Sequence, residues 1–289
     1  VLLEKLRPVE RELHYDRLLL RGPLEMAGEG FARRGVMSFD ELADNAEAEI
    51  ETRHIRFGDA AAVLWTSGTT GKPKGVIQSH NVWIRAALNN DRLYGTRPGD
   101  VAYNCLPLYN SAAWVANIYR ALSTGIPCAL DEQFSVSKFW NRIRHYGATQ
   151  TMTLGAMHMF LWNAPRRDDD ADNPLRVASM VPMPQKLIAP FCERFGLEAI
   201  VQGLGQSEVM PILSKVETPA RQCKPNALGK LFDDMEVKLL RDDGEEAGPG
   251  EVGEFSIRPL APHVIFSGYF DDPEATSRAY RGEWYCTGD

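Results

Sequence analysis

The apolar positions of the first sixty residues form short, separated patterns. An amphipathic segment at the start, with Leu2, Leu6 and Val9 on one side, predicts a helix, and the run from Leu18 to Leu20 predicts a short buried strand. Residues 27–56 are acidic, contain glycine and are weakly periodic, which is typical of surface connections. We therefore expect little of the chemistry to lie in this region.

A strand, a polar loop and a second strand are predicted around residue 70. The compact apolar run from Ala60 to Trp65 suits an interior strand, and Val76 opens the next apolar run after a loop of Ser, Thr, Gly and Lys. Ser79 or Asn81 can cap the helix that follows, and strand-like and helical segments alternate as far as about Ile212. This alternation favours an α/β fold with β-sheets flanked by helices.

The pattern changes near Thr218. Short, partly alternating runs between residues 228 and 265 are separated by Asp243-Gly244 and by other turns that contain glycine and proline, which predicts a small, distorted β-barrel. We therefore expect α/β sheet subdomains with the polar loop at residues 1–217 and a β-barrel-like subdomain at residues 218–289.

Composition and charge exclude several classes of protein. Lys and Arg number 32 against 39 Asp and Glu, a net charge of -7, so we expect no nucleic-acid partner. Five cysteines occur without a CxxC pair, which argues against a structural zinc site and a disulfide framework. No stretch approaches the roughly 18 apolar residues of a membrane span, and the first residues are charged where a signal peptide is apolar. We expect a cytoplasmic protein; its oligomeric state stays open.

The loop at residues 66–75 carries the strongest chemical signal. It holds four hydroxyl groups, three glycines and two lysines in the order Thr66-Ser67-Gly68-Thr69-Thr70-Gly71-Lys72-Pro73-Lys74-Gly75. Glycine lets backbone N–H groups approach an anion, hydroxyls donate further hydrogen bonds, and lysines supply positive charge to phosphate oxygens. Because such a loop rarely follows a buried strand by chance, we interpret it as a phosphate-binding loop rather than as an ordinary Gly/Ser surface loop.

The loop does not have the spacing of a kinase-type P-loop. That motif places four residues between its first glycine and its Gly-Lys-Ser/Thr, whereas only Thr69 and Thr70 separate Gly68 from Gly71. Pro73 also removes a backbone donor directly after the lysine and leaves no hydroxyl there for magnesium.

The loop resembles instead the phosphate-binding signature of the adenylate-forming superfamily, which includes acyl-CoA and aryl-CoA synthetases, luciferases and the adenylation domains of peptide synthetases. The resemblance extends, with gaps, from about Ala60 to Asp289, and it implies the fold of the N-terminal domain of these enzymes. It assigns catalytic roles at the β- and γ-phosphates to Thr69, Lys72 and Lys74. It assigns nucleotide binding to Thr66, Ser67, Gly68, Thr69, Thr70, Gly71 and Lys72.

The family also has a C-terminal lid domain that supplies a further catalytic lysine. The chain opens at Val1 without an initiator Met and stops at Asp289, where a turn should lead onward. We therefore expect a fragment of the large N-terminal domain from which the lid domain is absent.

Leu204-Gly205-Gln206-Ser207-Glu208 resembles the family's second nucleotide motif, an aromatic-Gly-x-Thr-Glu pattern. The resemblance implies that Ser207 contacts the α-phosphate and that Glu208 holds Mg²⁺, a role that suits a hard carboxylate oxygen. Leu204 replaces the aromatic residue that stacks on adenine. Met180-Val181-Pro182 lies where the family lines the adenine, with core packing of Met180 as an equal explanation. The further nucleotide contacts implied are Val181, Pro182, Leu204, Gly205, Gln206, Ser207 and, as the ribose ligand, Asp289.

Leu106-Pro107-Leu108-Tyr109-Asn110 resembles a motif in which CoA ligases commonly carry His, and amino-acid-activating domains commonly carry Asp, in place of Asn110. Without that Asp, a substrate ammonium lacks its charge partner, so a simple acyl or aryl acid is preferred. The Met-rich segment from Gly155 to Trp162 suits a pocket wall or a core helix, in which His158 is a satisfied core histidine. We expect the acid to contact Tyr109, Asn110 and Met157.

Together these features predict an ATP-dependent acid–thiol ligase that uses ATP, Mg²⁺ and CoA. A carboxylic acid would be activated as its acyl-AMP with release of pyrophosphate and then transferred to CoA. Two alternatives stay open. One is an adenylation domain that loads a carrier protein, and the other is a non-catalytic nucleotide-binding homologue, which the departures at Leu204, Asn110 and Met180 would suit.

Overall fold

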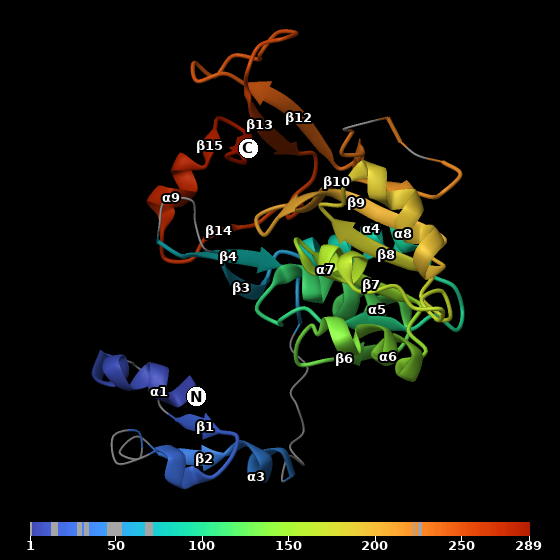
Figure 1. The fold of residues 1–289 in the computed structure, drawn as a ribbon. Helices are drawn as coiled ribbons and strands as arrows, with labels where there is room; N and C mark the ends of the chain where they lie inside the picture. Colours follow the sequence, from blue (N-terminus) through green and yellow to red (C-terminus); the bar gives the residue numbers. More distant parts are fainter. Residues whose placement is uncertain are drawn as a thin grey trace. The chain divides into compact units, whose positions relative to one another are not determined.

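The computed structural model describes residues 2–12, 17–27, 31, 35–44, 54–66, 72–221, 223–224 and 227–289. Contacts between residues divide the chain into two compact units, Val1–His54 and Ile55–Asp289, and each unit has its own secondary structure (Figure 1). Among the described helices, none is both long enough and apolar enough to cross a lipid bilayer.

The first unit contains a two-stranded parallel sheet. Its elements are α1 (Leu2–Leu6), η1 (Arg7–Glu12), β1 (Leu18–Leu20), η2 (Leu24–Ala27), β2 (Val36–Ser38) and α3 (Phe39–Asp44). β1 pairs with β2. The predicted strand at Leu18–Leu20 therefore forms, but it is not buried, because Leu19 is 46% exposed. The sequence did not indicate β2 and α3, since elements this short give no periodic pattern.

The second unit is built around a seven-stranded sheet with the order β11-β10-β9-β8-β7-β5-β6. Its strands are β5 (Ala102–Asn104), β6 (Cys128–Leu130), β7 (Gln150–Leu154), β8 (Val177–Val181), β9 (Ala199–Gln206), β10 (Met210–Glu217) and β11 (Lys230–Leu231). The pairs from β6 through β9 are parallel, whereas β10 and β11 are antiparallel to their neighbours. Helical connections join the parallel strands, as this direction requires.

Helices cover both faces of this sheet (Figure 1). One face carries α4 (His80–Tyr94), η3 (Ala113–Ile118) and α5 (Tyr119–Thr124). The other face carries α6 (Val136–Tyr146), α7 (Met157–Asn163), η4 (Gln185–Leu187) and α8 (Ile188–Phe195). Of the two caps considered for α4, Ser79 is the one used, and its hydroxyl accepts a hydrogen bond from the N–H of Val82.

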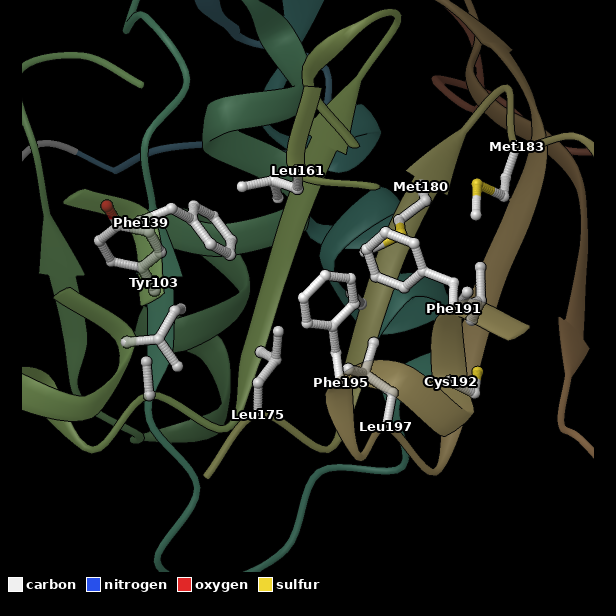
Figure 2. Close-up of a cluster of buried hydrophobic side chains, with 14 of the residues drawn as sticks. Tyr103, Phe139, Leu161, Leu175, Met180, Met183, Phe191, Cys192, Phe195 and Leu197 are labelled. Carbon is white, nitrogen blue, oxygen red and sulfur yellow. The ribbon is translucent and has the colours of Figure 1, made fainter. Parts of the chain in front are cut away.

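The largest hydrophobic core lies between the sheet and α6 to α8. Figure 2 shows Phe191 and Phe195 of α8 beside Met180 of β8, and all three side chains are fully buried. The core-packing explanation of Met180 is therefore confirmed. Because close packing fixes β8 in this core, the end of the strand at Val181 is held in a defined position.

Two smaller sheets complete the unit. One has the order β14-β4-β3, and the other has the order β12-β13-β16-β15. Their elements, with one helix between them, are β3 (Ala60–Thr66), β4 (Lys74–Ser79), β12 (Met235–Leu240), β13 (Glu254–Pro259), β14 (Gly268–Tyr269), α9 (Pro273–Arg278), β15 (Tyr280–Arg281) and β16 (Trp284–Cys286). The mixed α/β fold is confirmed, and the strands expected in a small barrel are shared between sheets. The subdomain division at residue 217 stays a prediction.

The strand, loop and strand predicted around residue 70 form the antiparallel pair β3 and β4. The expectation that β3 is an interior strand is wrong, because it is the edge strand of its sheet and Trp65 is 62% exposed. An apolar run identifies a strand, but it does not say whether other elements cover both faces. The fully buried Val76 shows that β4 is the interior strand of the pair.

Candidate active site

Tyr269 joins the end of the β3–β4 hairpin to the turn between β9 and β10. Because β14 pairs with β4, Tyr269 lies beside Val76. The Nζ atom of Lys74 lies 4.7 Å from the centre of the Tyr269 ring, and the Tyr269 hydroxyl donates a hydrogen bond of 2.9 Å to Oε1 of Glu208. Burial, followed by the negative charge of Glu208, raises the pKa of Tyr269. The hydroxyl therefore stays protonated and keeps its role as donor.

Gln206 connects the end of β9 to the last residues of the chain. Its Nε2 atom donates to Oδ2 of Asp289 at 2.9 Å and to the backbone carbonyl of Thr287 at 3.0 Å. The hydroxyl of Tyr285 donates to Oε1 of Gln206 at 3.2 Å, which fixes the orientation of the amide. The exposed Asp289 carboxylate keeps capacity to accept hydrogen bonds from two vicinal hydroxyl groups.

Ser207 lies between these two groups of contacts. Its backbone carbonyl accepts a hydrogen bond of 2.6 Å from Nε2 of Gln78 on β4, and its hydroxyl is 3.5 Å from that of Ser111. The three regions that the sequence indicated therefore meet: the strand after the phosphate-binding loop, the motif at residues 204–208 and the end of the chain at Asp289.

The centre of the predicted phosphate-binding loop, Ser67 to Gly71, lies outside the described residues, so the predicted contacts of Ser67, Gly68, Thr69, Thr70 and Gly71 stay predictions. Its two ends are described. Thr66 pairs with Lys74 across the hairpin, and Lys72 is exposed. The hairpin thus brings both ends of the loop to the side of β4 where Lys74 meets Tyr269.

A pocket of about 380 Å³ opens beside Ser207. One end contains Asn110, Ser111, Gln206 and Ser207, and the walls are largely apolar. Among the described residues that line the pocket, none carries a charge. A charge without a partner is costly to bury, so the pocket suits a ligand whose body is neutral.

Several predicted binding residues line this pocket: Asn110, Val181, Leu204, Gly205, Gln206 and Ser207. Gly205 is required by its surroundings, because a Cβ atom there would lie 2.4 Å from the carbonyl oxygen of Met210. The side chain of Asn110 also has a structural role, since its Oδ1 atom accepts a hydrogen bond of 2.9 Å from the N–H of Ala112 before η3.

Tyr109 and Met157 are not among the residues that line the pocket. Tyr109 is 79% exposed, and Met157 packs against the main core with its sulfur 3.4 Å from the N–H of Leu154. The pocket is lined by Met152 and Leu154 instead. The roles of Tyr109 and Met157 as acid contacts stay predictions.

His158 is a buried core histidine rather than a pocket residue. Its Nε2 atom donates to the carbonyl of Pro182 at 2.7 Å, and its Nδ1 atom is 3.2 Å from the hydroxyl of Thr153. Burial lowers the pKa of His158, which keeps the ring neutral. Pro182 therefore has its carbonyl occupied by a structural contact.

Sequence patterns assigned no site role to three residues that organise the site: Tyr269, Gln78 and Ser111. The string Gly268-Tyr269 is visible as a glycine followed by an aromatic residue. Nothing in it indicates that β14 pairs with β4 and so brings Tyr269 to Glu208. Gln78 and Ser111 act through long-range contacts for which a local pattern gives no signal.

Glu208 offers the ligand chemistry that Mg²⁺ needs. In the described part of the chain, no three His, Cys, Asp or Glu residues gather where they could hold a metal ion. Mg²⁺ is usually bound through one or two carboxylates, with waters and substrate phosphates completing the octahedron. A single half-buried carboxylate, next to Ser207 in the chain and linked to Lys74 through Tyr269, fits a metal that binds together with a nucleotide.

The fold and the candidate site define an α/β protein whose functional groups gather at the carboxyl ends of parallel strands, which is where open sheets bind their ligands. Residues 18–270 match the model of the AMP-binding enzyme family, and the chain belongs to this family. The resemblance to the adenylate-forming superfamily that the motifs indicated is therefore confirmed.

The curated relatives described below are CoA ligases by name. The chain is 29% identical over 287 residues to crotonobetaine/carnitine–CoA ligase of Salmonella enteritidis, covering 98% of this chain and 55% of the relative. It is 32% identical over 251 residues to a medium/long-chain-fatty-acid–CoA ligase of Mycobacterium tuberculosis, covering 86% and 48%. The chain thus spans about half the length of the curated relatives it matches.

A solved structure shares the fold. O-succinylbenzoate coenzyme A synthetase from Bacillus subtilis, in complex with ATP and magnesium ion, superposes with a TM-score of 0.78 at 25% sequence identity. The match covers 99% of this chain and 58% of that protein. The α/β fold expected for the N-terminal domain of adenylate-forming enzymes is therefore confirmed.

Proposed function

We propose that this chain is the nucleotide-binding and acid-binding part of an ATP-dependent acid–CoA ligase. The enzyme activates an acyl or aryl carboxylic acid as its acyl-AMP, releases pyrophosphate and transfers the acyl group to CoA. The observation that carries the proposal is that Tyr269 links Lys74 to Glu208 and Gln206 holds Asp289, next to an uncharged pocket lined by Gln206 and Ser207, in a chain of the AMP-binding enzyme family.

In this proposal the residues of the chain position two substrates and neutralise charge. Lys72 and Lys74, with the hydroxyls of Thr69 and Thr70, hold the β- and γ-phosphates of ATP, and Ser207 donates a hydrogen bond to the α-phosphate. The other predicted nucleotide contacts, Thr66, Ser67, Gly68, Gly71, Val181, Pro182, Leu204 and Gly205, surround the same region.

The carboxylate of Asp289 accepts hydrogen bonds from the ribose hydroxyls, and Gln206 holds that carboxylate in place. Mg²⁺, held by Glu208, would supply positive charge to the phosphate oxygens. An oxygen of the acid attacks the α-phosphorus, the new acyl–phosphate bond forms, and the bond to pyrophosphate breaks. Positioning and charge stabilisation then account for most of the rate.

CoA as the acceptor is supported by the names of the relatives, which are CoA ligases. Loading of a carrier protein stays the alternative. The relatives act on different acids, so none of their substrates is transferred to this chain. Asn110 differs from the His or Asp of the family motif, but this difference does not favour a non-catalytic homologue. Its side chain has a structural role, because it accepts a hydrogen bond from the N–H of Ala112 at the start of η3.

ATP–pyrophosphate exchange tests the proposal. The full-length protein that contains this chain is incubated with Mg²⁺, ATP, labelled pyrophosphate and a panel of fatty, branched and aromatic acids. Exchange that depends on the acid supports adenylate formation, and thioester formation with CoA, compared with a carrier protein, identifies the acceptor. Absence of exchange with every acid would refute catalysis and favour the non-catalytic homologue.

The role of the phosphate-binding loop can be tested by ATP binding, without measuring turnover. The double variant Thr69→Ala with Lys72→Ala is expected to abolish the protection that ATP gives against thermal unfolding. A ligand at 100 times its Kd stabilises a protein that binds it by about 2.7 kcal/mol, so the loss is measurable by calorimetry. Lys138→Ala, on the exposed side of α6, is the control and should keep the protection. Unchanged protection in the double variant would place the phosphates elsewhere.

A cytoplasmic location also belongs to the proposal, and it is supported by the scattered cysteines, which have the pattern of reduced thiols. Cell fractionation of the full-length protein tests it.

A further inference from the structure

The uncharged pocket runs along the strands of the main sheet towards Ser207. Strand register places Met152, Ser179 and Val201 side by side in one row across β7, β8 and β9. From Val201 to Gly205 the pocket follows β9 over four steps, or about 13 Å at about 3.3 Å per residue. The pocket therefore extends from Ser207, which is half-buried and lies beside the predicted nucleotide groups, to Ser179, which is 4% exposed; these are its mouth and its deep end.

Asn90 of α4 covers the deep end and presents an acceptor. Its Nδ2 atom donates a hydrogen bond of 2.8 Å to the carbonyl of Ala86. A carbonyl oxygen can only accept, so the amide must have its NH₂ group on this side, and its orientation is fixed. Asn90 lines the pocket, and no donor among the described residues bonds its Oδ1 atom. That oxygen lacks a partner in the described part of the chain.

Ser179 presents a second acceptor from the wall of the sheet. The hydroxyl of Tyr94 donates its only proton to the carbonyl of Thr151 at 3.0 Å. Tyr94 therefore has no proton to donate to Ser179, and the Ser179 hydroxyl keeps lone pairs that can accept a hydrogen bond from a ligand. Asn90 thus requires a hydrogen-bond donor at the deep end, and Ser179 can accept from the same donor.

The lining of the deep end disfavours ionised groups there. None of the described residues that line the pocket carries a charge, so a cationic group at the deep end would lack a counter-ion. A second carboxylate would lack one as well, and it would bring only acceptors to the Oδ1 atom of Asn90.

We infer that the deep end of the pocket binds a neutral hydrogen-bond donor, so that the substrate is a monocarboxylic acid with an alcohol or phenol hydroxyl far from its carboxylate. The inference rests on the proposed function, which places the carboxylate at Ser207. The hydroxyl donates to Oδ1 of Asn90 or Oγ of Ser179. Val115, Met152 and Leu154 line the space for an apolar body between the two ends.

Matched acids test the inference. The full-length protein is assayed by ATP–pyrophosphate exchange with straight-chain and aryl acids, each with a terminal hydroxyl, no substituent or a terminal carboxylate. We expect kcat/KM to be roughly 10-fold or more higher for the hydroxy acid than for the unsubstituted acid, because the latter leaves buried acceptors unpaired. We expect the diacid to be poorer still, since its second charge has no partner.

Asn90→Leu should remove or reverse the preference for the hydroxy acid, because it replaces the acceptor with an apolar group of similar size. Asn89→Leu is the matched control on the same helix, since Asn89 is also buried and does not line the pocket. If Asn90→Leu does not fold, Ser179→Ala should weaken the preference in the same direction. Thermal shifts of each protein with the same acids report binding without turnover.

The outcomes separate the inference from the proposed function. Exchange that is equal with hydroxylated and unsubstituted acids would uphold adenylate formation and overturn the inference. The inference would also be wrong if Asn90→Leu and Asn89→Leu changed the preference alike. Absence of exchange with all acids would refute the proposed function; the thermal shifts would then still decide whether the pocket prefers the hydroxy acid.

Discussion

Replacement of Glu208 by Gln should lower kcat for ATP–pyrophosphate exchange by about 10²–10³-fold, the effect of losing one charge-stabilising group at a reacting centre. Gln has nearly the same size and can still accept the hydrogen bond from Tyr269. It loses the negative charge that would hold Mg²⁺ against the phosphate oxygens. Exchange rates at saturating ATP and acid, measured over a range of Mg²⁺ concentrations, give the size of the loss.

Two further variants identify the cause of that loss. Glu198→Gln removes a carboxylate that forms an exposed ion pair of 2.9 Å with Arg97, and exchange should stay close to that of the wild type. Tyr269→Phe removes only the donor to Glu208, so its loss should be smaller than that of Glu208→Gln. The assignment of Glu208 as the metal ligand is wrong if Glu208→Gln exchanges normally while Tyr269→Phe does not.

The parts of the site that could be predicted from the sequence are those whose chemistry is local. Ser207 and Glu208 lie in one short motif, and Asp289 ends another, so the resemblance of these motifs to the adenylate-forming superfamily singled them out. The β3–β4 hairpin could be predicted because two apolar runs enclose a glycine-rich loop. Each of these features occupies a continuous stretch of about twenty residues or fewer, over which local patterns are informative.

The remaining parts depend on pairings between distant segments. Tyr269 reaches Glu208 only because a two-residue strand, β14, adds to β4, and a strand of that length has no periodic signal. The exposure of Trp65 depends on the place of β3 at the edge of its sheet, which the residues of β3 do not encode. The orientation of the Asn90 amide, whose oxygen has no partner among the described residues, follows from a single hydrogen bond to Ala86.

Asp100→Asn should lower the free energy of unfolding by about 3–5 kcal/mol, the usual effect of removing one partner of a buried ion pair. Asp100 is 4% exposed and pairs with Arg176 through both Nε and Nη2. Its carboxylate also accepts hydrogen bonds from the N–H of Arg97, the Thr149 hydroxyl and the Gln150 amide. Asn has one acceptor oxygen and no charge, so Arg176 would be left in the interior without its counter-ion.

The pH dependence of the unfolding free energy tests whether loss of the Asp100 charge causes this destabilisation. Burial alone would raise the pKa of Asp100, but the hydrogen bonds from Arg176, Arg97 and Thr149 outweigh it and lower the pKa from 3.8 to about 2. Because the folded pKa is the lower one, the stabilisation is fully present above 3.8 and is lost as the pH falls towards 2. The difference in unfolding free energy between wild type and Asp100→Asn should therefore be constant at neutral pH and shrink over that acid range.

The bonds of Asp100 and the candidate site lie at opposite ends of the parallel strands. Thr149 and Arg176 directly precede β7 and β8, and Asp100 lies just before β5, so these bonds hold the amino ends of the parallel strands. The candidate site lies at their carboxyl ends. Asp100→Asn should thus lower the midpoint of urea unfolding but leave the preference among acids unchanged, whereas the exposed Asp243→Asn should alter neither. A changed acid preference in Asp100→Asn, measured where the variant is still folded, would show that the amino and carboxyl ends of the parallel strands are coupled.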